Sequence, residues 1–262
     1  MRVRAPKARV LARSDHLIAL HKPSGHPTEP TRDPKRPTLY HSALSALGEG
    51  AYLRVSHRLD LGTSGVVVMA VSEEGTRLLA HAFERREARK LYWALTACPP
   101  QGASLEEAER FERDEALLAW AVERSLTPPR GAEGAEQGVW RHLSAPMRPI
   151  KRKKDAPRPK KQLWEITRSG GKPAKSDFKV IALSPSLCLV AARPHTGRTH
   201  QLRVHLAALN APILGDLDYN PRAHLPRALT QRLWLHARAL ELPSTLSAEG
   251  DAPLLITAPF EL

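Results

Sequence analysis

Asp60 is the acidic residue whose surroundings first suggest chemistry. It lies in the stretch VSHRLDLGTSGVVVMA, residues 55–70, two residues after Arg58 and shortly before a Thr-Ser-Gly turn and an apolar run. A carboxylate beside a guanidinium stays ionised, and an ionised carboxylate that is aimed and partly shielded from water can act as a nucleophile or a base. An Asp before Thr-Ser is also a common turn or capping residue. On spacing alone the two interpretations are evenly matched.

The histidines suggest a second chemistry, metal binding. His195, His200 and His205 follow one another at five-residue steps. Five residues turn a helix through about 140°, and an odd step places residues on opposite faces of a strand. Three ligands at this spacing do not converge, so we expect hydrogen-bonding or core histidines and no metal site.

Arginines and one tyrosine provide groups that recognise nucleic acids. Arg193, Arg198 and Arg203 are also five residues apart; most such arginines are solvated, but one or two can reach phosphates. Tyr92, in RKLYWAL, would ordinarily be a half-buried sheet aromatic. Beside a carboxylate cleft in a basic protein, its ring can instead stack on a base.

The overall charge favours a polyanionic partner. The chain has 262 residues and 40 Lys+Arg against 27 Asp+Glu, a net charge of +13, which is typical of proteins that bind nucleic acid. A positive charge that serves only to keep the protein soluble is a weaker explanation of this composition. No apolar run approaches the ~20 residues of a membrane span, and the basic stretch at residues 1–15 lacks the apolar segment of a signal peptide. We therefore expect a cytoplasmic protein with no membrane partner.

The apolar patterns predict an α+β domain that positions these residues. Strands are predicted at 17–20, 66–71, 88–97, 139–143, 175–183, 187–197 and 253–262. Helices are predicted at 38–47, 75–87, 104–125, 199–210 and 226–240. Because strands and helices do not alternate regularly, we expect a mixed, largely antiparallel sheet. No GxGxxG, Walker or HExxH signature occurs, which argues against a nucleotide cofactor or a zinc protease.

A basic run lies at residues 146–162, with eight Lys/Arg and one Asp. Such runs are usually solvated surfaces. In this chain the run is also the natural place to touch phosphates, and we predict that it contacts an RNA backbone.

Five ordered sequence blocks resemble the RluA-type pseudouridine synthases. The central family motif, HRLDxxTSGxxxxA, is matched in full by residues 57–70. The other blocks are HKPSG (21–25), KLYWAL (90–95), GKPAKSDFKVI (171–181) and RPHTGRTHQLRVHLAALNAPILGDLDY (193–219). The likeness covers about residues 10–262.

The resemblance implies the pseudouridine synthase fold, a mixed, largely antiparallel sheet with flanking helices and a central basic active-site cleft. It implies one catalytic domain over 10–262 after a basic tail of 1–9, without the S4 domain of many relatives and with 104–162 as a variable charged insertion. The implied activity is isomerisation of specific uridines to pseudouridine in structured ribosomal or transfer RNA. No cofactor and no metal are implied, and we expect a monomer.

The resemblance also implies roles for individual residues. Asp60 is the catalytic residue, and Tyr92 stacks on the target base and is the favoured base for the C5 proton. Arg203 pairs with the catalytic aspartate, and Arg58 flips and holds the nucleotide. Further substrate-binding candidates are His57, Thr63, Ser64, Gly65, Arg198, His200 and Gln201.

The sequence is compatible with several chemical routes and with more than one function. The carboxylate can add to C6 of uracil, attack C1′, or help remove the 2′ proton to give a glycal, and each route needs it ionised. A non-catalytic RNA-binding or RNA-chaperone protein on the same scaffold is the main alternative function. A metal-dependent nuclease is a weaker one, because it predicts paired carboxylates and clustered ligands that the sequence pattern does not show.

Overall fold

The computed structural model describes residues 8–48, 50–127, 139–151, 162–220, 229, 231–247 and 252–262. The chain divides into two compact units. Unit 1 comprises Met1–Trp93, Leu118–Gln137 and Leu235–Leu262, and unit 2 comprises Ala94–Leu117 and Gly138–Trp234. The single catalytic domain over 10–262 stays a prediction, and all but two residues of the predicted tail lie outside the described part of the chain.

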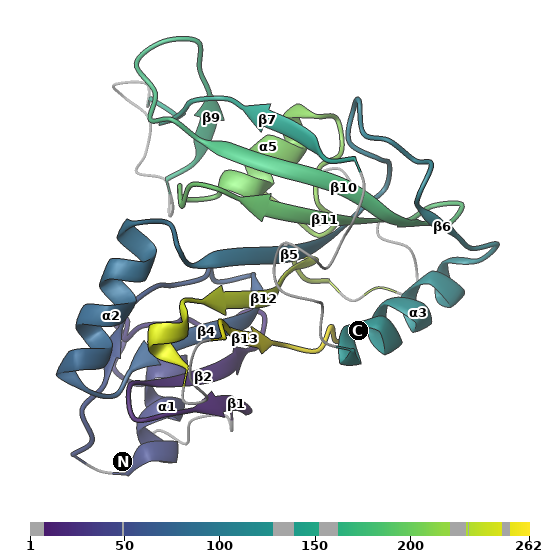
Figure 1. Ribbon diagram of the computed structural model, residues 1–262. Coiled ribbons are helices and arrows are strands. Elements are labelled where there is room, and N and C mark those ends of the chain that lie inside the picture. The colour runs from purple at the N-terminus through teal and green to yellow at the C-terminus, as the bar shows by residue number, and fades with distance from the viewer. Residues whose placement is uncertain are drawn as a thin grey trace. The chain divides into compact units, whose positions relative to one another are not determined.

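The sheet of unit 1 brings the two ends of the chain together. Strands β1 (Val10–Arg13), β2 (Leu17–Lys22), β4 (Ser64–Ala70) and β12 (Leu235–Leu242) are neighbours in that order. The first two pairs are antiparallel, and β4 pairs with β12 in parallel. At its edges β13 (Leu254–Thr257) pairs with β12, and β3 (Arg54–Val55) pairs with β4. In Figure 1 strand β4 lies between the purple strand β2 and the yellow strand β12.

Strand β4 is buried on both faces, which explains its unbroken apolar run. Val66 and Val68 face a core that includes Leu79 of helix α2 (Glu73–Glu84). Val67 and Met69 face a second core that includes Leu39 of helix α1 (Leu39–Leu47). The predicted strand and both predicted helices are confirmed. Side-chain caps at Thr38 and Ser72 begin the two helices, as their sequence positions suggest.

Gly65 permits the close approach of β4 and β12. Its φ is +115°, and a Cβ at this position would lie 2.2 Å from the carbonyl oxygen of Ala237. Any side chain at Gly65 would push these two strands apart, so glycine is required here for both backbone shape and space.

The predicted helix at 226–240 is wrong over its described part, because residues 235–242 form strand β12. Every residue of β12 is buried. Leu235, Ala237 and Ala239 alternate with His236 and Arg238, which is the period-two pattern of a strand that the helix prediction overlooked. Even Arg238 lies in the core of unit 1, where its guanidinium donates to the carbonyls of Ala258 and Thr127.

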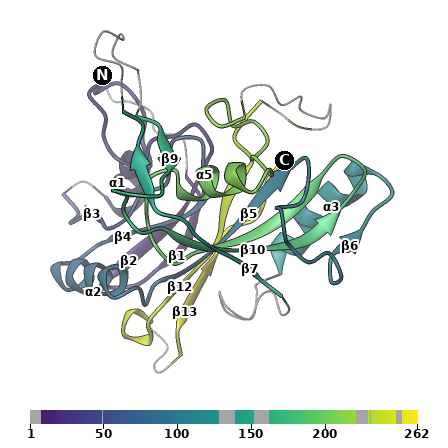
Figure 2. The same ribbon diagram turned by 90° about the horizontal axis from the view of Figure 1, so that it is seen from above.

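Unit 2 is built on a second group of strands. Strand β10 (Lys175–Leu183) pairs antiparallel with β11 (Cys188–Pro194) and with β7 (Arg141–Ser144), and parallel with β6 (Glu109–Arg110). A separate antiparallel pair consists of β8 (Met147–Pro149) and β9 (Trp164–Ile166). Helix α5 (Gln201–Ala208) contacts β9 and β11, and Figure 2 shows it close to β9. Both units thus mix helices with a largely antiparallel sheet, which confirms the predicted fold class.

Helix α3 (Asp114–Leu126) is shorter than the predicted helix at 104–125. The Asp114 carboxylate accepts hydrogen bonds from the Ser184 hydroxyl at 2.7 Å and from the Ser186 N–H at 3.2 Å. These hydrogen bonds to the turn between β10 and β11 fix where the helix begins.

Two elements remain among the described residues. They are a short 3-10 helix, η1 (Ser244–Leu246), and strand β5 (Arg89–Thr96), which begins in unit 1 and ends in unit 2. Among the described residues no helix is long and apolar enough to span a membrane.

Candidate active site

Asp60 lies in the loop that leads into β4, and its side chain is half-buried. The preceding residue, Leu59, is buried in the core that also contains α1. Thr63 donates its N–H to the carbonyl of Asp60 at 3.0 Å, which closes a tight turn before the strand. A buried anchor on one side and a turn on the other therefore hold the carboxylate at the entrance of β4.

The HKPSG loop fastens the Asp60 loop from outside. The hydroxyl of Ser24 donates to the carbonyl of Gly62 at 2.7 Å, and the N–H of Gly25 donates to that of Leu61 at 2.8 Å. Lys22 extends its Nζ between the two loops and donates to Leu61 O at 3.1 Å. Two sequence blocks of the family pattern therefore form one structural unit around Asp60.

Lys22 is completely buried. Besides Leu61 O, its Nζ donates to Pro23 O at 3.1 Å and to His26 O at 2.7 Å. Three carbonyls match the three hydrogens of an ammonium, which favours the charged form. Burial lowers the pKa of Lys22 to about 7, and the negative charge of Asp60 acts in the opposite direction. The charge of Asp60 therefore favours the charged form of Lys22.

His57 holds the other side of the loop. Its Nε2 accepts the N–H of Val68 on β4 at 3.0 Å, and its ring packs on Phe83 with centroids 4.8 Å apart. Burial, assisted by the positive charge of Lys90, lowers the pKa of His57 to about 3. The ring is therefore neutral, with its hydrogen on Nδ1. These contacts position the loop, and the predicted substrate contact of His57 stays a prediction.

Tyr92, on β5, packs against the core that contains α1 and Leu59. Burial, and after it the negative charge of Asp60, raise the pKa of the Tyr92 phenol. The phenol is therefore protonated at neutral pH. The electrostatic effect also shows that Tyr92 and Asp60 share one environment within unit 1.

Arg58 is placed differently from the other residues of its motif. Its side chain is 72% exposed, and it forms an ion pair of 3.3 Å with Glu29, which is itself exposed. Exposed pairs of this kind contribute about 0–1 kcal/mol. The guanidinium can therefore exchange this carboxylate for a phosphate at little cost.

The three residues after the Asp60 turn support the backbone. Thr63 and Ser64 are buried. His236 donates from Nε2 to the carbonyl of Ala258 at 3.2 Å, so its Nδ1 accepts the hydroxyl of Ser64 at 3.0 Å. With Gly65 packed on β12, all three residues help to fix the loop, and their predicted substrate contacts stay predictions.

In unit 2, Arg203 is buried and makes a bidentate ion pair. Its Nε and Nη2 lie 2.8 and 2.6 Å from the two carboxylate oxygens of Asp216, and Nη2 lies 2.5 Å from Asp218. These two aspartates belong to the GDLDY stretch, but their side chains were not predicted as partners. Pairing of Arg203 with Asp60, which lies in the other unit, stays a prediction, as does the central basic cleft.

Gln201 is a structural residue. Its Oε1 accepts from the Thr196 hydroxyl and the Arg198 N–H, and its Nε2 donates to Lys175 O and the Ser176 hydroxyl. These four bonds use the full capacity of a buried amide. Gln201 thus joins three neighbouring segments of unit 2, and its predicted substrate contact stays a prediction.

The neighbouring candidates Arg198 and His200 have other contacts. Arg198 donates from Nε to the carbonyl of Pro173 at 3.0 Å. His200 precedes α5 with a φ of 59° and contacts the Tyr219 hydroxyl through Nδ1 at 2.9 Å. Substrate contacts of Arg198 and His200 stay predictions.

The three equally spaced histidines diverge, as their spacing predicts. His200 contacts Tyr219, and buried His205 contacts the Ser176 hydroxyl and the Ala145 carbonyl. His195 instead contacts Asp177. The expectation of hydrogen-bonding or core histidines is confirmed.

Comparison with known proteins identifies the family. Residues 16–208 match the family model described as RNA pseudouridylate synthase. The chain is 30% identical over 237 residues to the dual-specificity RNA pseudouridine synthase RluA of Pasteurella multocida, covering 90% of this chain and 86% of that protein. It is 32% identical over 257 residues to tRNA pseudouridine synthase C of Haemophilus ducreyi, covering 94% and 90%. The solved structure of human RNA Pseudouridylate Synthase Domain Containing 4 shares the fold, with a TM-score of 0.63, 24% identity and coverage of 96% and 88%.

The chain belongs to the RNA pseudouridylate synthase family. It is an enzyme, an RNA pseudouridine synthase that isomerises uridine to pseudouridine, which confirms the predicted function. The comparisons offer no support for a non-catalytic RNA-binding protein.

Proposed function

We propose that Asp60 is the catalytic carboxylate and that it acts on a uridine flipped out of structured ribosomal or transfer RNA. The observation that carries the proposal is the loop around Asp60, which is fastened by Lys22 on one side and by His57 on the other. A carboxylate that is aimed by a rigid element loses little orientational freedom when it attacks. The protein acts as a monomer in the cytoplasm.

The reaction moves one bond and one proton. The bond between N1 and C1′ breaks, the uracil turns, and a bond between C5 and C1′ forms. C5 loses a proton and N1 gains one, so the product is an isomer. The ionised Asp60 serves this reaction by adding to C6, by attacking C1′ or by removing the 2′ proton, and each of these routes needs neither a cofactor nor a metal.

The pKa of Tyr92 sets an order of events. Before the reaction, burial and the charge of Asp60 keep the phenol of Tyr92 protonated. In this state the ring of Tyr92 stacks on the base. When Asp60 forms a covalent bond with the nucleotide, its negative charge disappears and one cause of the raised pKa is removed. The phenol then gives up its hydrogen more readily, to the N1 of uracil that gains a proton in the reaction, and the phenolate so formed accepts the C5 proton. In this scheme the base step follows the attack of Asp60.

Arg58 supplies the contact that holds the flipped nucleotide. Extrusion of a nucleotide costs a few kcal/mol of stacking. Stacking on Tyr92 recovers about 1–3 kcal/mol of this. The exposed guanidinium of Arg58 can bind the phosphate of the extruded residue or fill the space that the base leaves.

The test is the variant Asp60→Asn, which keeps the size of the side chain and removes its charge. Release of tritium from [5-³H]uridine-labelled RNA reports loss of the C5 proton, and filter retention reports RNA binding. We expect activity to fall by about 10³-fold or more with binding preserved. The control is Asp15→Asn, at an exposed aspartate before β2, which should behave as wild type. An Asp60→Asn protein with wild-type activity would disprove the assignment.

A second measurement identifies the RNA. Carbodiimide treatment followed by primer extension maps pseudouridines in ribosomal and transfer RNA from cells with and without the gene. We expect at least one site in one of these two classes to disappear when the gene is removed and to return when it is restored. An unchanged map in both classes would contradict the proposed substrates.

A further inference from the structure

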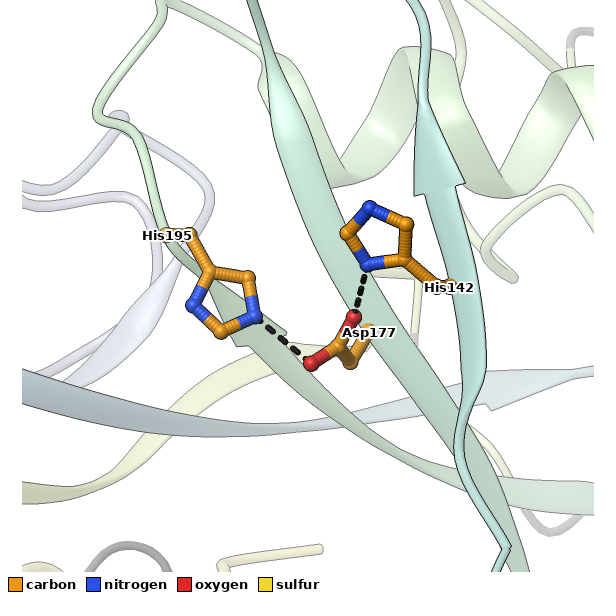
Figure 3. A group of neighbouring side chains, drawn as sticks. All are labelled: His142, Asp177 and His195. Atoms are coloured by element: carbon orange, nitrogen blue, oxygen red, sulfur yellow. Dashed lines mark hydrogen bonds and ion pairs between the residues drawn. The ribbon is translucent and has the colours of Figure 1, made fainter.

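Two histidines and one aspartate converge within unit 2, and none of them is among the residues assigned to catalysis. His142 on β7 lies directly opposite Asp177 on β10, and His195 follows the last residue of β11. The Nδ1 of His142 lies 2.5 Å from one Asp177 oxygen, and the Nε2 of His195 lies 2.6 Å from the other. Figure 3 shows both rings turned toward the carboxylate.

The three groups have the composition and closeness of a metal site. One ligand atom of each residue lies within 4.8 Å of the other two. Two imidazole nitrogens with one carboxylate oxygen form a common donor set for zinc and neighbouring divalent metals. Zinc holds such atoms at about 2.0–2.2 Å, which separates the ligands by a little over 3 Å. The two nitrogen–oxygen distances, 2.5 and 2.6 Å, need to open by less than about 1 Å to admit an ion, and the two ring nitrogens, within 4.8 Å of each other, need to approach by at most about 1.5 Å.

The surroundings are also suitable for a metal ion. The side chains of His142 and His195 are about half exposed, so an ion and its waters have access. Burial raises the pKa of Asp177, but the hydrogen bonds from the two histidines outweigh it and lower that pKa overall. The carboxylate is therefore ionised at neutral pH.

We propose that His142, Asp177 and His195 bind one divalent transition-metal ion of the zinc class, with water completing its coordination. The metal replaces the hydrogens that the two rings direct at Asp177. In a neutral ring the single hydrogen moves through solvent from the ligating nitrogen to the other ring nitrogen, and a protonated ring keeps one hydrogen and releases the other on binding. The ion joins three neighbouring strand segments and is independent of the chemistry at Asp60.

The position of the site suggests what the ion does. Strand β7 has four residues and is followed directly by β8 and the basic run 146–162. An ion shared by β7, β10 and the end of β11 fixes the point at which this run leaves the sheet. The site therefore stabilises unit 2 and anchors a segment that we predict to contact phosphates.

The experiment uses the full chain, stripped with a chelator and dialysed. Zn²⁺ binding is measured by calorimetry, and Co²⁺ is added as a spectroscopic probe of nitrogen and oxygen ligands. We expect one ion per chain and a rise in Tm of about 5 °C at hundredfold excess over Kd. The variants are His142→Ala, His195→Ala and Asp177→Asn, and each should weaken binding by about 30-fold or more. The control is His81→Ala, at an exposed histidine on α2, which should bind as wild type.

Two results would overturn the proposal. One is the absence of saturable binding of either metal up to about 1 mM. The other is stoichiometric binding that survives in all three variants, provided that circular dichroism shows them to be folded. Asp60→Asn should still bind the ion, so failure of the metal site and failure of the catalytic assignment are distinguishable.

Discussion

The Nζ of Lys22 lies 3.1 Å from the carbonyl oxygen of Leu61, the residue that follows Asp60. This bond joins two sequence motifs that are far apart in the chain and places a buried ammonium next to the loop of Asp60, the proposed catalytic carboxylate. Because the charge of Asp60 also acts on the pKa of Lys22, the contact is both mechanical and electrostatic.

Replacing Lys22 with Met should loosen the Asp60 loop. Three carbonyls lose their donor, and an unsatisfied buried polar group costs about 1–3 kcal/mol. We expect the free energy of unfolding, measured by urea denaturation, to fall by about 2–4 kcal/mol and tritium release to fall by about tenfold or more. Lys35→Met, at an exposed lysine, is the matched control. Equal stability and activity in both variants would show that Lys22 does not hold the loop.

Replacing Tyr92 with Phe should separate stacking from proton transfer. Phe stacks as Tyr does, so we expect RNA affinity within about threefold of wild type. Loss of the hydroxyl removes the proposed base, and we expect tritium release to fall by about 10²–10⁴-fold. Tyr92→Ala should lose both the stacking contribution to RNA affinity and the release of tritium. If Tyr92→Phe released tritium at the wild-type rate, the hydroxyl would have no part in removing the C5 proton.

The neutral His57 ring should make stability depend on pH. Its pKa is about 3 in the folded protein against 6.5 for an unperturbed histidine, so between these values the unfolded chain holds one more proton. The contribution of His57 to the free energy of unfolding is fully present above pH 6.5. It is lost as the pH falls toward 3, and the free energy of unfolding changes by up to ~1.4 kcal/mol per pH unit. Urea unfolding between pH 4.5 and 7 should show a shallower dependence for His57→Gln than for wild type. His81→Gln should keep the wild-type slope, and identical slopes for all three proteins would contradict the argument.

Gly65→Ala should destabilise the protein through contact as well as backbone strain. Gly170 also has a positive φ, +69°, but a Cβ there meets nothing within 4 Å. We expect Gly170→Ala to cost about 1 kcal/mol and Gly65→Ala to cost about 3 kcal/mol or more by urea denaturation. Similar losses at both positions would mean that the packing of β4 on β12 tolerates a methyl group.

The basic run at 146–162 should contribute to RNA affinity through charge. Residues 152–161 of this run lie outside the described part of the chain, so the prediction comes from the sequence. Replacing Lys153, Lys154, Lys160 and Lys161 with Gln should weaken binding and reduce the slope of log K against log salt by ~0.7–0.9 for each lost phosphate contact. Binding with an unchanged slope would show that these lysines do not touch phosphates.

Several features could be predicted because their causes are local. The apolar run at 66–71 predicts a buried strand, and the apolar spacing at 38–47 and 75–87 predicts two helices, because strand burial and helical periodicity depend on residues a few positions apart. The unbroken match of residues 57–70 to a family motif likewise pointed to Asp60 and to the enzyme class. Each of these signals is contained in a short segment.

Other features were decided only by the tertiary structure, because they depend on the register between distant segments. The buried residues of 235–242 form a strand rather than a helix because β4 and β13 pair with them. Arg203 finds Asp216 and Asp218 where a turn returns the chain to α5. His142 meets Asp177 because β7 and β10 align at that pair, and nothing in the spacing of either residue along the chain encodes that alignment.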